Sequence, residues 1–426
     1  MIKNSDIKTK SKDYSLYTWS SQRTINTIAV KNAQGCYYWD YEGKQYFDLC
    51  SQLACVNIGH GNDEVIKAIV EQANELSFVK PKFTTRIRGE VSELIINEFA
   101  PYMSKILYST GGAESNEYAL RMAQVYTGRK KVFSQYNSYH GSTYGAACLS
   151  GDISRGNPVI KIPGFMYFWG ENNRLIDHEN DEHGDSEYYL KLLDKQLIYE
   201  NPSEVACIFL ETIPGGNSLV MSSKKYLQGV RKMCDKYGIL LIVDEVLTGF
   251  GRTGYKFAVD YYGIRPDMIT FSKGVTSAYL PLGGVIVNES IADFFDTHGV
   301  PVGCTYNSHP LCLAAAKANL EVIIKNKLIE NCMKMGEILE QGLNEVAKKH
   351  YCIEERRGIG LLQGLKVKDA YTNTNFLSSV FKTFAQKGYP TNGNQGNILF
   401  SPPFIVSEEE INRIIEVADE VLSYIE

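Results

Sequence analysis

Several features that would point to a familiar class of protein are missing from the chain. Its 44 Lys and Arg residues are outnumbered by 49 Asp and Glu, and the formal net charge is −5. An acidic chain without a basic patch argues against nucleic acid and against an anionic membrane surface as partners. The N-terminus has no apolar signal segment, and no apolar stretch reaches transmembrane length. We therefore expect a soluble, cytoplasmic protein that acts on a small molecule.

A disulfide framework and a metal site are also missing from the pattern. The chain has ten cysteines, but none in Cys-x-x-Cys spacing, and several lie inside apolar runs such as Ala206-Cys207-Ile208. This usage is typical of reduced cysteines in a core. His178 and His183 lie in a polar run, 170–187, but without the spacing of metal ligands on a defined element. We interpret that run as a solvated loop and predict no metal.

A carboxylate and a lysine follow two predicted buried strands. The run from Ile239 to Val246 is apolar and contains Asp244 and Glu245 near its end, as expected for a strand that is buried on both faces of a parallel sheet. A second short strand, 268–271, runs into Lys273. Open α/β sheets bind ligands at the carboxyl ends of their strands. We therefore expect Asp244 and Lys273 to meet at one edge of one sheet.

This pairing has a chemical explanation. Burying a lysine ammonium costs several kcal/mol by order of magnitude unless the lysine is paired or neutral, and a Schiff base with an aldehyde avoids that cost. The aldehyde that uses a lysine together with an acid is pyridoxal phosphate (PLP), whose pyridine nitrogen the acid keeps protonated. The alternatives are that Asp244 caps a helix or pairs with Arg252, and that Lys273 is a surface lysine in a loop.

A glycine turn offers a place for the phosphate. A predicted strand, 105–108, leads through Gly111, Gly112 and Ala113 into a predicted helix of about 114–126. Free backbone N–H groups and the positive end of the helix dipole stabilise a phosphate at such a position. Gly112 and Ala113 are the expected contacts. An ordinary turn is the alternative interpretation.

Three motifs together resemble a known family. They are Asp244-Glu-Val-Leu-Thr-Gly-Phe-Gly-Arg-Thr-Gly254, Ser272-Lys273-Gly274 and Leu282-Gly-Gly284. They are similar to the signature of the class III PLP-dependent aminotransferases, the ω-amino-acid group, and the resemblance extends from about residue 15 to the C-terminus. It implies an α/β chain of PLP-dependent transferase fold type I, which has a large domain with a mostly parallel central sheet and a smaller α+β domain.

The same resemblance implies a division of the chain and an assembly. An N-terminal segment, 1–60, joins the small domain, 61–304 forms the large PLP-binding domain, and 305–426 forms the C-terminal small domain. The expected assembly is an obligate homodimer with shared active sites. Whether dimers pair into tetramers stays open.

The resemblance also gives roles to residues around the cofactor. Tyr139 is expected to pack flat on the pyridine ring, with His140 beside it and Val246 on the opposite face. Glu211 ends another predicted buried strand and is expected to face the active site. Thr305 is expected to reach the phosphate of the other subunit. A hydrogen-bonded loop is the alternative for Tyr139 and His140.

On the substrate side, the resemblance places two residues at the walls of the pocket. Trp19 corresponds to a residue that lines the active site in the family, although packing in a core or an interface is the alternative. Ala54 stands where family members that accept bulky amines often carry a tryptophan, so the pocket is expected to have a different shape.

One departure from the family concerns the acid-binding group. Many members place an arginine shortly before Ser-Pro-Pro, but 388–401 contains none. Arginine binds anionic groups through paired, charge-assisted hydrogen bonds. Arg155 is the first candidate to replace it, with Arg86 and Arg88 behind. A solvated loop charge is the alternative for Arg155.

Within the family the pattern looks most like the 2-oxoglutarate-dependent taurine aminotransferases. The expected reaction transfers an amino group from a short ω-amino acid, such as taurine, to a 2-oxo acid, such as 2-oxoglutarate, and gives sulfoacetaldehyde and glutamate. The alternatives are a β-alanine, 4-aminobutyrate or diamine aminotransferase that uses pyruvate, an aminomutase or decarboxylase of the same fold, and a catalytically silent binding protein.

Overall fold

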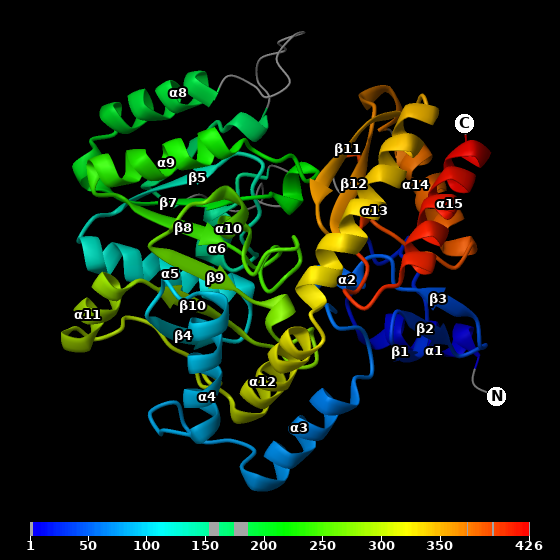
Figure 1. Ribbon diagram of the computed structural model, residues 1–426, viewed down its shortest axis with the longest axis horizontal. Coiled ribbons are helices and arrows are strands. Elements are labelled where there is room, and N and C mark those ends of the chain that lie inside the picture. The colour runs from blue at the N-terminus through cyan, green and yellow to red at the C-terminus, as the bar shows by residue number, and fades with distance from the viewer. Residues whose placement is uncertain (1–2, 153–161, 174–185, 373, 394–395, 426) are drawn as a thin grey trace.

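A seven-stranded sheet forms the centre of the larger part of the molecule, as the computed structural model in Figure 1 shows. The structure describes residues 3–152, 162–173, 186–372, 374–393 and 396–425. The strand order is β4-β10-β9-β8-β7-β5-β6, and only β10 is antiparallel to its neighbours. The predicted mostly parallel sheet is therefore confirmed. In chain order the strands are β4 Lys105–Ser109, β5 Lys131–Gln135, β6 Phe165–Phe168, β7 Val205–Glu211, β8 Leu240–Asp244, β9 Met268–Phe271 and β10 Gly283–Val287.

Both faces of this sheet are buried, which explains why its strands are apolar without interruption. Along β8, Leu241 and Val243 belong to one hydrophobic cluster, whereas Leu240 and Ile242 belong to another. Helix α5 (Gly112–Thr127) covers the second face, and α9 (Lys224–Tyr237) covers the first. Asp244, the last residue of β8, is buried as well and lies at the carboxyl edge of the sheet.

Strands β7 and β8 bring two acids together at that edge. They are parallel, and their register pairs Glu211 directly with Asp244. Strand β9 lies beside β8 and ends at Phe271, two residues before Lys273. The topology therefore places the predicted acid and the predicted lysine on neighbouring strands.

A smaller part lies beside the large one in Figure 1 and contains two three-stranded sheets. The C-terminal sheet packs with long helices. Helix α15 begins with a capping box, in which Ser407 and Glu410 exchange hydrogen bonds, as the Ser-x-x-Glu pattern of the sequence predicts. The elements are β1 Val30–Gln34, β2 Tyr37–Asp40, β3 Gln45–Phe47, β11 Ile353–Ile359, β12 Leu362–Val367, β13 Asn397–Phe400, α13 Leu328–Lys349, α14 Thr374–Gln386 and α15 Glu408–Ile425.

Contacts join the N-terminal sheet to the C-terminal elements. The Tyr37 hydroxyl donates to Glu410 at 2.8 Å, and the Phe47 N–H donates to the Gly388 carbonyl at 2.8 Å. Such contacts are what the predicted attachment of 1–60 to the small domain requires, while the domain boundaries themselves stay a prediction. The other main helices are α1 Asn4–Tyr14, α2 Ser51–Ala54, α3 Asp63–Glu75, α4 Arg86–Leu94, α6 Tyr144–Leu149, α8 Ser186–Tyr199, α10 Ala258–Tyr262, α11 Glu289–Thr297 and α12 Pro310–Lys325. Among the described residues, none of the helices combines the length and the apolar character of a transmembrane span.

A buried arginine ties three segments of the chain together. Arg252 is fully buried, and its guanidinium donates to the carbonyls of Leu361 and Pro402 at 2.9 and 2.8 Å and to the side chains of Asn57 and Ser51 at 2.7 and 3.2 Å. It forms no ion pair with the described residues, so Asp244 is not its partner and that alternative is wrong. Burial lowers the pKa of Arg252 to about 10.

Replacing this guanidinium is expected to destabilise the protein strongly. Arg252→Leu leaves two carbonyls, an amide and a hydroxyl buried without their donor, and we expect a loss of about 3 kcal/mol or more in the free energy of unfolding. Arg252→Lys keeps a charge and some donors, so it should lie between Arg252→Leu and the wild type. Thermal unfolding of the cofactor-free protein measures both. An Arg252→Leu variant with the wild-type midpoint would contradict this assignment.

Candidate active site

A cavity of about 330 Å³ lies at the carboxyl edge of the central sheet. Such a volume is in the range of small-molecule and cofactor sites. Ten of the predicted site residues line it: Trp19, Ala54, Gly112, Ala113, Tyr139, His140, Glu211, Asp244, Val246 and Lys273. Gly111 and Thr305 do not line it. Arg155, His178 and His183 lie outside the described residues.

The carboxylate of Asp244 is held by three donors. Its Oδ2 accepts from the Asn116 amide at 2.8 Å and lies 2.8 Å from His140 Nδ1. Its Oδ1 accepts from the Val246 N–H at 2.9 Å. The Asp244 side chain is 5% exposed, so this is a buried acid with a fixed orientation. With a single described donor, Oδ1 has a lone pair left for a cationic N–H in the cavity.

Glu211 holds two loops beside the cavity. Its Oε1 accepts from the Tyr139 N–H at 2.8 Å, and its Oε2 accepts from the Gly215 N–H at 3.2 Å. Burial raises the pKa of Glu211 to about 7. We note that His140 and Asp244 act on this group in opposite directions, since the imidazole lowers its pKa and the carboxylate raises it. Glu211 therefore fixes the backbone that carries the Tyr139 ring.

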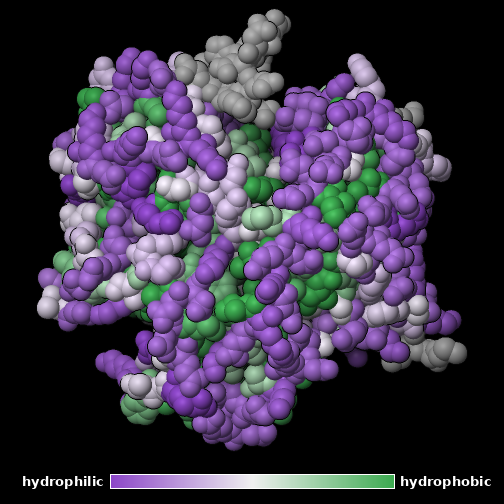
Figure 2. All heavy atoms as spheres, in the orientation of Figure 1, coloured by the Kyte–Doolittle hydropathy of each residue, from purple (hydrophilic) through white to green (hydrophobic). Residues whose placement is uncertain are grey.

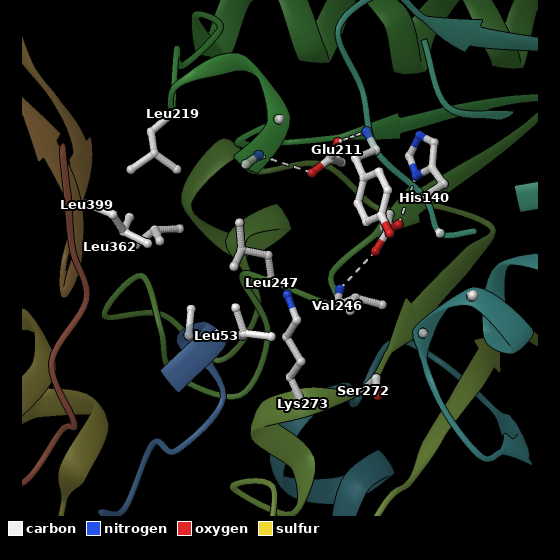
Figure 3. Close-up of a pocket in the computed structure, with 18 of the residues that line it drawn as sticks. Leu53, His140, Glu211, Leu219, Val246, Leu247, Ser272, Lys273, Leu362 and Leu399 are labelled. Carbon is white, nitrogen blue, oxygen red and sulfur yellow. Dashed lines mark hydrogen bonds and ion pairs between the residues drawn. The ribbon is translucent and has the colours of Figure 1, made fainter. Parts of the chain in front are cut away.

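The Lys273 side chain extends into the cavity from the turn after β9, as Figure 3 shows. It is partly buried and forms no ion pair with the described residues, so the surface-lysine alternative is wrong. Burial lowers the pKa of the Lys273 ammonium. The residue has a φ of 47°, a left-handed conformation that costs of order 1–3 kcal/mol for a residue other than glycine. A partly buried amine with a lowered pKa has the properties that a Schiff-base lysine needs.

The glycine turn before α5 fits a phosphate. The helix begins at Gly112, with Gly111 at its N-cap, and its first N–H groups have no partner within the helix. A Cβ on Gly112 would lie 2.8 Å from Val246 Cγ1, so only glycine lets this turn approach Val246 so closely. Together with the acceptor at Asp244 and the amine at Lys273, the donor set matches the phosphate, the ring nitrogen and the aldehyde of PLP.

The other end of the cavity is apolar. Figure 3 shows Leu53, Leu219, Leu247, Leu362 and Leu399 around it. These leucines come from α2, from the loops after β7 and β8, and from β12 and β13. Trp19, 65% exposed in the single chain, and Ala54 also line the cavity.

Two predicted acid-binding candidates lie elsewhere. Arg86 forms an ion pair with Glu90 at 2.8 Å, and Arg88 donates to the Pro81 carbonyl at 2.9 Å. Neither lines the cavity. Glu90 of α4 (Arg86–Leu94) holds Arg86, and the Pro81 carbonyl, in the segment before this helix, holds Arg88. A role for either arginine in binding an acidic group stays a prediction.

Sequence reasoning missed several residues that line the cavity. Asn116 follows the phosphate turn by one helical turn, and its spacing from Gly112 was the available signal. Asn392, Gly393 and Asn397 carry no pattern that separates them from an ordinary loop and strand. The five leucines at the apolar end of the cavity, which form a leucine wall, gave no signal either, since they are far apart in the chain.

Comparisons with known proteins agree with this architecture. The fold is that of the PLP-dependent transferases of fold type I. The taurine:2-oxoglutarate aminotransferase from Bifidobacterium kashiwanohense, solved with PLP and glutamate, superposes with a TM-score of 0.94 at 35% identity and covers 100% of this chain and 98% of its own. An (S)-enantioselective omega-transaminase from Thermomicrobium roseum has a TM-score of 0.95 at 28% identity and covers 100% of this chain and 99% of its own.

The family follows from the sequence match. The pattern of the Aminotransferase class-III family matches residues 18–422. The putrescine–pyruvate aminotransferase of Pseudomonas aeruginosa is 31% identical over 438 residues, covering 97% of this chain and 94% of that enzyme. The chain therefore belongs to the class III aminotransferases, which are PLP-dependent enzymes.

Proposed function

We propose that this aminotransferase moves the amino group of a short ω-amino acid, taurine, to 2-oxoglutarate. The observation that carries the proposal is the similarity to the taurine:2-oxoglutarate enzyme, at 35% identity over the whole chain. Trp19 and Ala54 support it, because both line the cavity where the amine donor has to enter. The products are sulfoacetaldehyde and glutamate.

PLP, when bound, supplies an aldehyde and an electron-withdrawing ring. Lys273 would hold this aldehyde and afterwards move protons at its Nζ. Its lowered pKa increases the neutral fraction of the amine near neutral pH, and a neutral amine can accept a proton from the donor carbon and return it. The partly buried setting of Lys273 limits competition from water.

The remaining residues bind and orient. Asp244 would keep the ring nitrogen protonated through the free lone pair of Oδ1, and the backbone N–H groups of Gly112 and Ala113 would hold the phosphate, with Gly111 forming the turn. Tyr139 and Val246 flank the ring, with His140 beside Asp244. Glu211 fixes the loop of Tyr139 through the 2.8 Å bond to its backbone.

Arg155 is the proposed partner of the sulfonate or carboxylate. No arginine lines the cavity among the described residues, and the family's arginine before Ser-Pro-Pro has no counterpart in 388–401. A donor with an anionic end therefore needs a cation from elsewhere in the chain or from a partner subunit.

We also propose a homodimer in which Thr305 reaches the phosphate of the other subunit. Thr305 is exposed in the single chain, and its neighbour Tyr306 is 60% exposed. Figure 2 shows hydrophobic residues along the middle of the face drawn there. Tyr14 and Leu16, two positions apart in the chain, are 84% and 86% exposed, and a subunit interface would remove these apolar side chains from water.

A diamine aminotransferase that uses pyruvate is the second candidate. The five leucines of the cavity and the lack of a described lining arginine favour a donor with a hydrocarbon chain and no acidic end. The 31% identity to the putrescine–pyruvate enzyme supports the same alternative.

One panel of assays separates the candidates. Taurine, β-alanine, 4-aminobutyrate and putrescine are tested as donors, each with pyruvate and with 2-oxoglutarate, and both products are identified. The proposal expects the highest kcat/KM for taurine with 2-oxoglutarate and the appearance of glutamate. Highest activity for putrescine with pyruvate would favour the second candidate. Product formation without any keto acid would indicate an aminomutase or decarboxylase.

A further inference from the structure

Asn116 links the helix of the glycine turn to Asp244. It belongs to α5, one turn after Gly112, and its side chain lines the cavity while being 1% exposed. The helix that begins at the phosphate turn therefore also carries a polar side chain toward the acid at the end of β8.

The Asn116 amide makes two hydrogen bonds with acceptors only. Its Nδ2 donates to the His140 carbonyl at 2.7 Å and to Asp244 Oδ2 at 2.8 Å. Because both partners are acceptors, the orientation of the amide follows from chemistry. Its Oδ1 is buried and has no hydrogen-bond partner. The surroundings of Asn116 thus use both N–H donors of its amide and leave the amide oxygen without a partner.

These bonds determine how the Asp244 carboxylate can turn. His140 Nδ1 lies 2.8 Å from the same Oδ2, so Asn116 and His140 together saturate this oxygen. Oδ1 then faces the Val246 N–H, at 2.9 Å, and keeps its second lone pair. Without the amide, one charge-assisted hydrogen bond fewer would hold Oδ2, and the carboxylate could rotate away from the ring nitrogen.

We propose that Asn116 is a positioning residue, which orients Asp244 toward the PLP ring nitrogen and ties that acid to the helix that holds the phosphate. The inference rests on the proposed role of Asp244. It predicts that Asn116 sets both the affinity for PLP and the electronic state of the bound cofactor, although Asn116 itself needs no contact with the reacting atoms.

The experiment compares PLP binding and the visible absorption of the holoenzyme in the wild type, Asn116→Ala, Asn116→Asp and Asp244→Asn. We expect Asn116→Ala to weaken PLP binding about tenfold, since a hydrogen bond to a charged group is lost, and to shift the visible band. Asn116→Asp is nearly isosteric but places an acceptor beside Asp244, so it should weaken PLP binding more than Asn116→Ala does. If Asn116→Ala does not fold, Asn116→Asp tests the positioning role of Asn116 in its place.

Asn288→Ala is the matched control. The side-chain amide N–H of Asn288 donates to Asp267 at 3.1 Å. This is also a hydrogen bond from an amide to a carboxylate, but Asn288 does not line the cavity. This variant should lower the thermal midpoint of the cofactor-free protein but leave the affinity for PLP and the visible band unchanged. Wild-type affinity and absorption in both Asn116 variants would overturn the inference. The inference would also be overturned if the Asn116 variants lost only thermal stability, as Asn288→Ala is expected to do. An unchanged band in Asp244→Asn would instead refute the role of Asp244.

Discussion

Lys273→Ala is expected to lose turnover by about 10⁴-fold or more, with any donor and acceptor. The substitution removes both the amine that bonds to the cofactor and the base that moves the proton, and general acid–base catalysis alone typically contributes up to about that factor. The absorption band that reports the bond between Lys273 and PLP should vanish, although PLP can still bind through the phosphate turn. Single-turnover assays and absorption spectra measure the two effects separately.

Two further variants separate the amine from the charge. Lys273→Arg keeps a cation in the cavity, but a guanidinium stays protonated and does not form the bond to the aldehyde, so it should be as inactive as the alanine variant. Lys256→Ala removes an exposed lysine from the loop between β8 and β9 and should keep wild-type activity. Normal turnover in Lys273→Ala would refute the assignment of this lysine.

The convergence of Asp244 and Lys273 at one sheet edge could be predicted from the sequence, because it depends on strand topology. A buried apolar run ending in an acid can be recognised locally, and parallel neighbours bring such ends together. The capping box at Ser407 and Glu410 was equally accessible, since both partners lie within one helical turn. Prediction from the sequence therefore succeeded where the interaction lies within one short segment or follows from the order of parallel strands.

Other features depend on contacts between distant segments. The sequence predicts a strand at 28–30 and a turn at 32–35. Strand β1 instead runs from Val30 to Gln34, because its pairing with β2 continues through these polar residues. Arg252 was considered as a partner of Asp244, yet it bonds to carbonyls more than 100 positions away in the chain. No local pattern distinguishes such partners, because tertiary packing selects them.

The leucine wall illustrates the same limit for the candidate site. Leu53 and Leu399 are separated by most of the chain, and each one looks like an ordinary apolar residue in its own segment. To predict the pair Asp244 and Lys273, it was enough to recognise two adjacent strands. To predict the leucine wall, one would have to know how the small and large parts of the molecule lie relative to each other. Chemistry was therefore easier to predict than specificity.

Asp244→Asn is expected to lower kcat by about 100- to 1000-fold and to weaken PLP binding, because it removes the charge that keeps the ring nitrogen protonated. The amide also cannot satisfy its surroundings. Asn116 and His140 donate to one carboxylate oxygen, and Val246 donates to the other. An amide offers a single acceptor atom, so in either orientation its NH₂ group faces at least one buried donor.

The matched control for this variant is Asp267→Asn. Asp267 also accepts several hydrogen bonds, from Arg231 at 2.8 Å and from the Leu241 N–H at 2.7 Å, but it does not line the cavity. Both variants should lower the thermal midpoint, since each leaves donors unsatisfied, but only Asp244→Asn should lower kcat and shift the visible band. Steady-state kinetics at saturating PLP makes the distinction, because a mere loss of cofactor would be restored there. If saturating PLP returned Asp244→Asn to the wild-type kcat, the acid would contribute to binding alone, and the electronic role argued for it would be wrong.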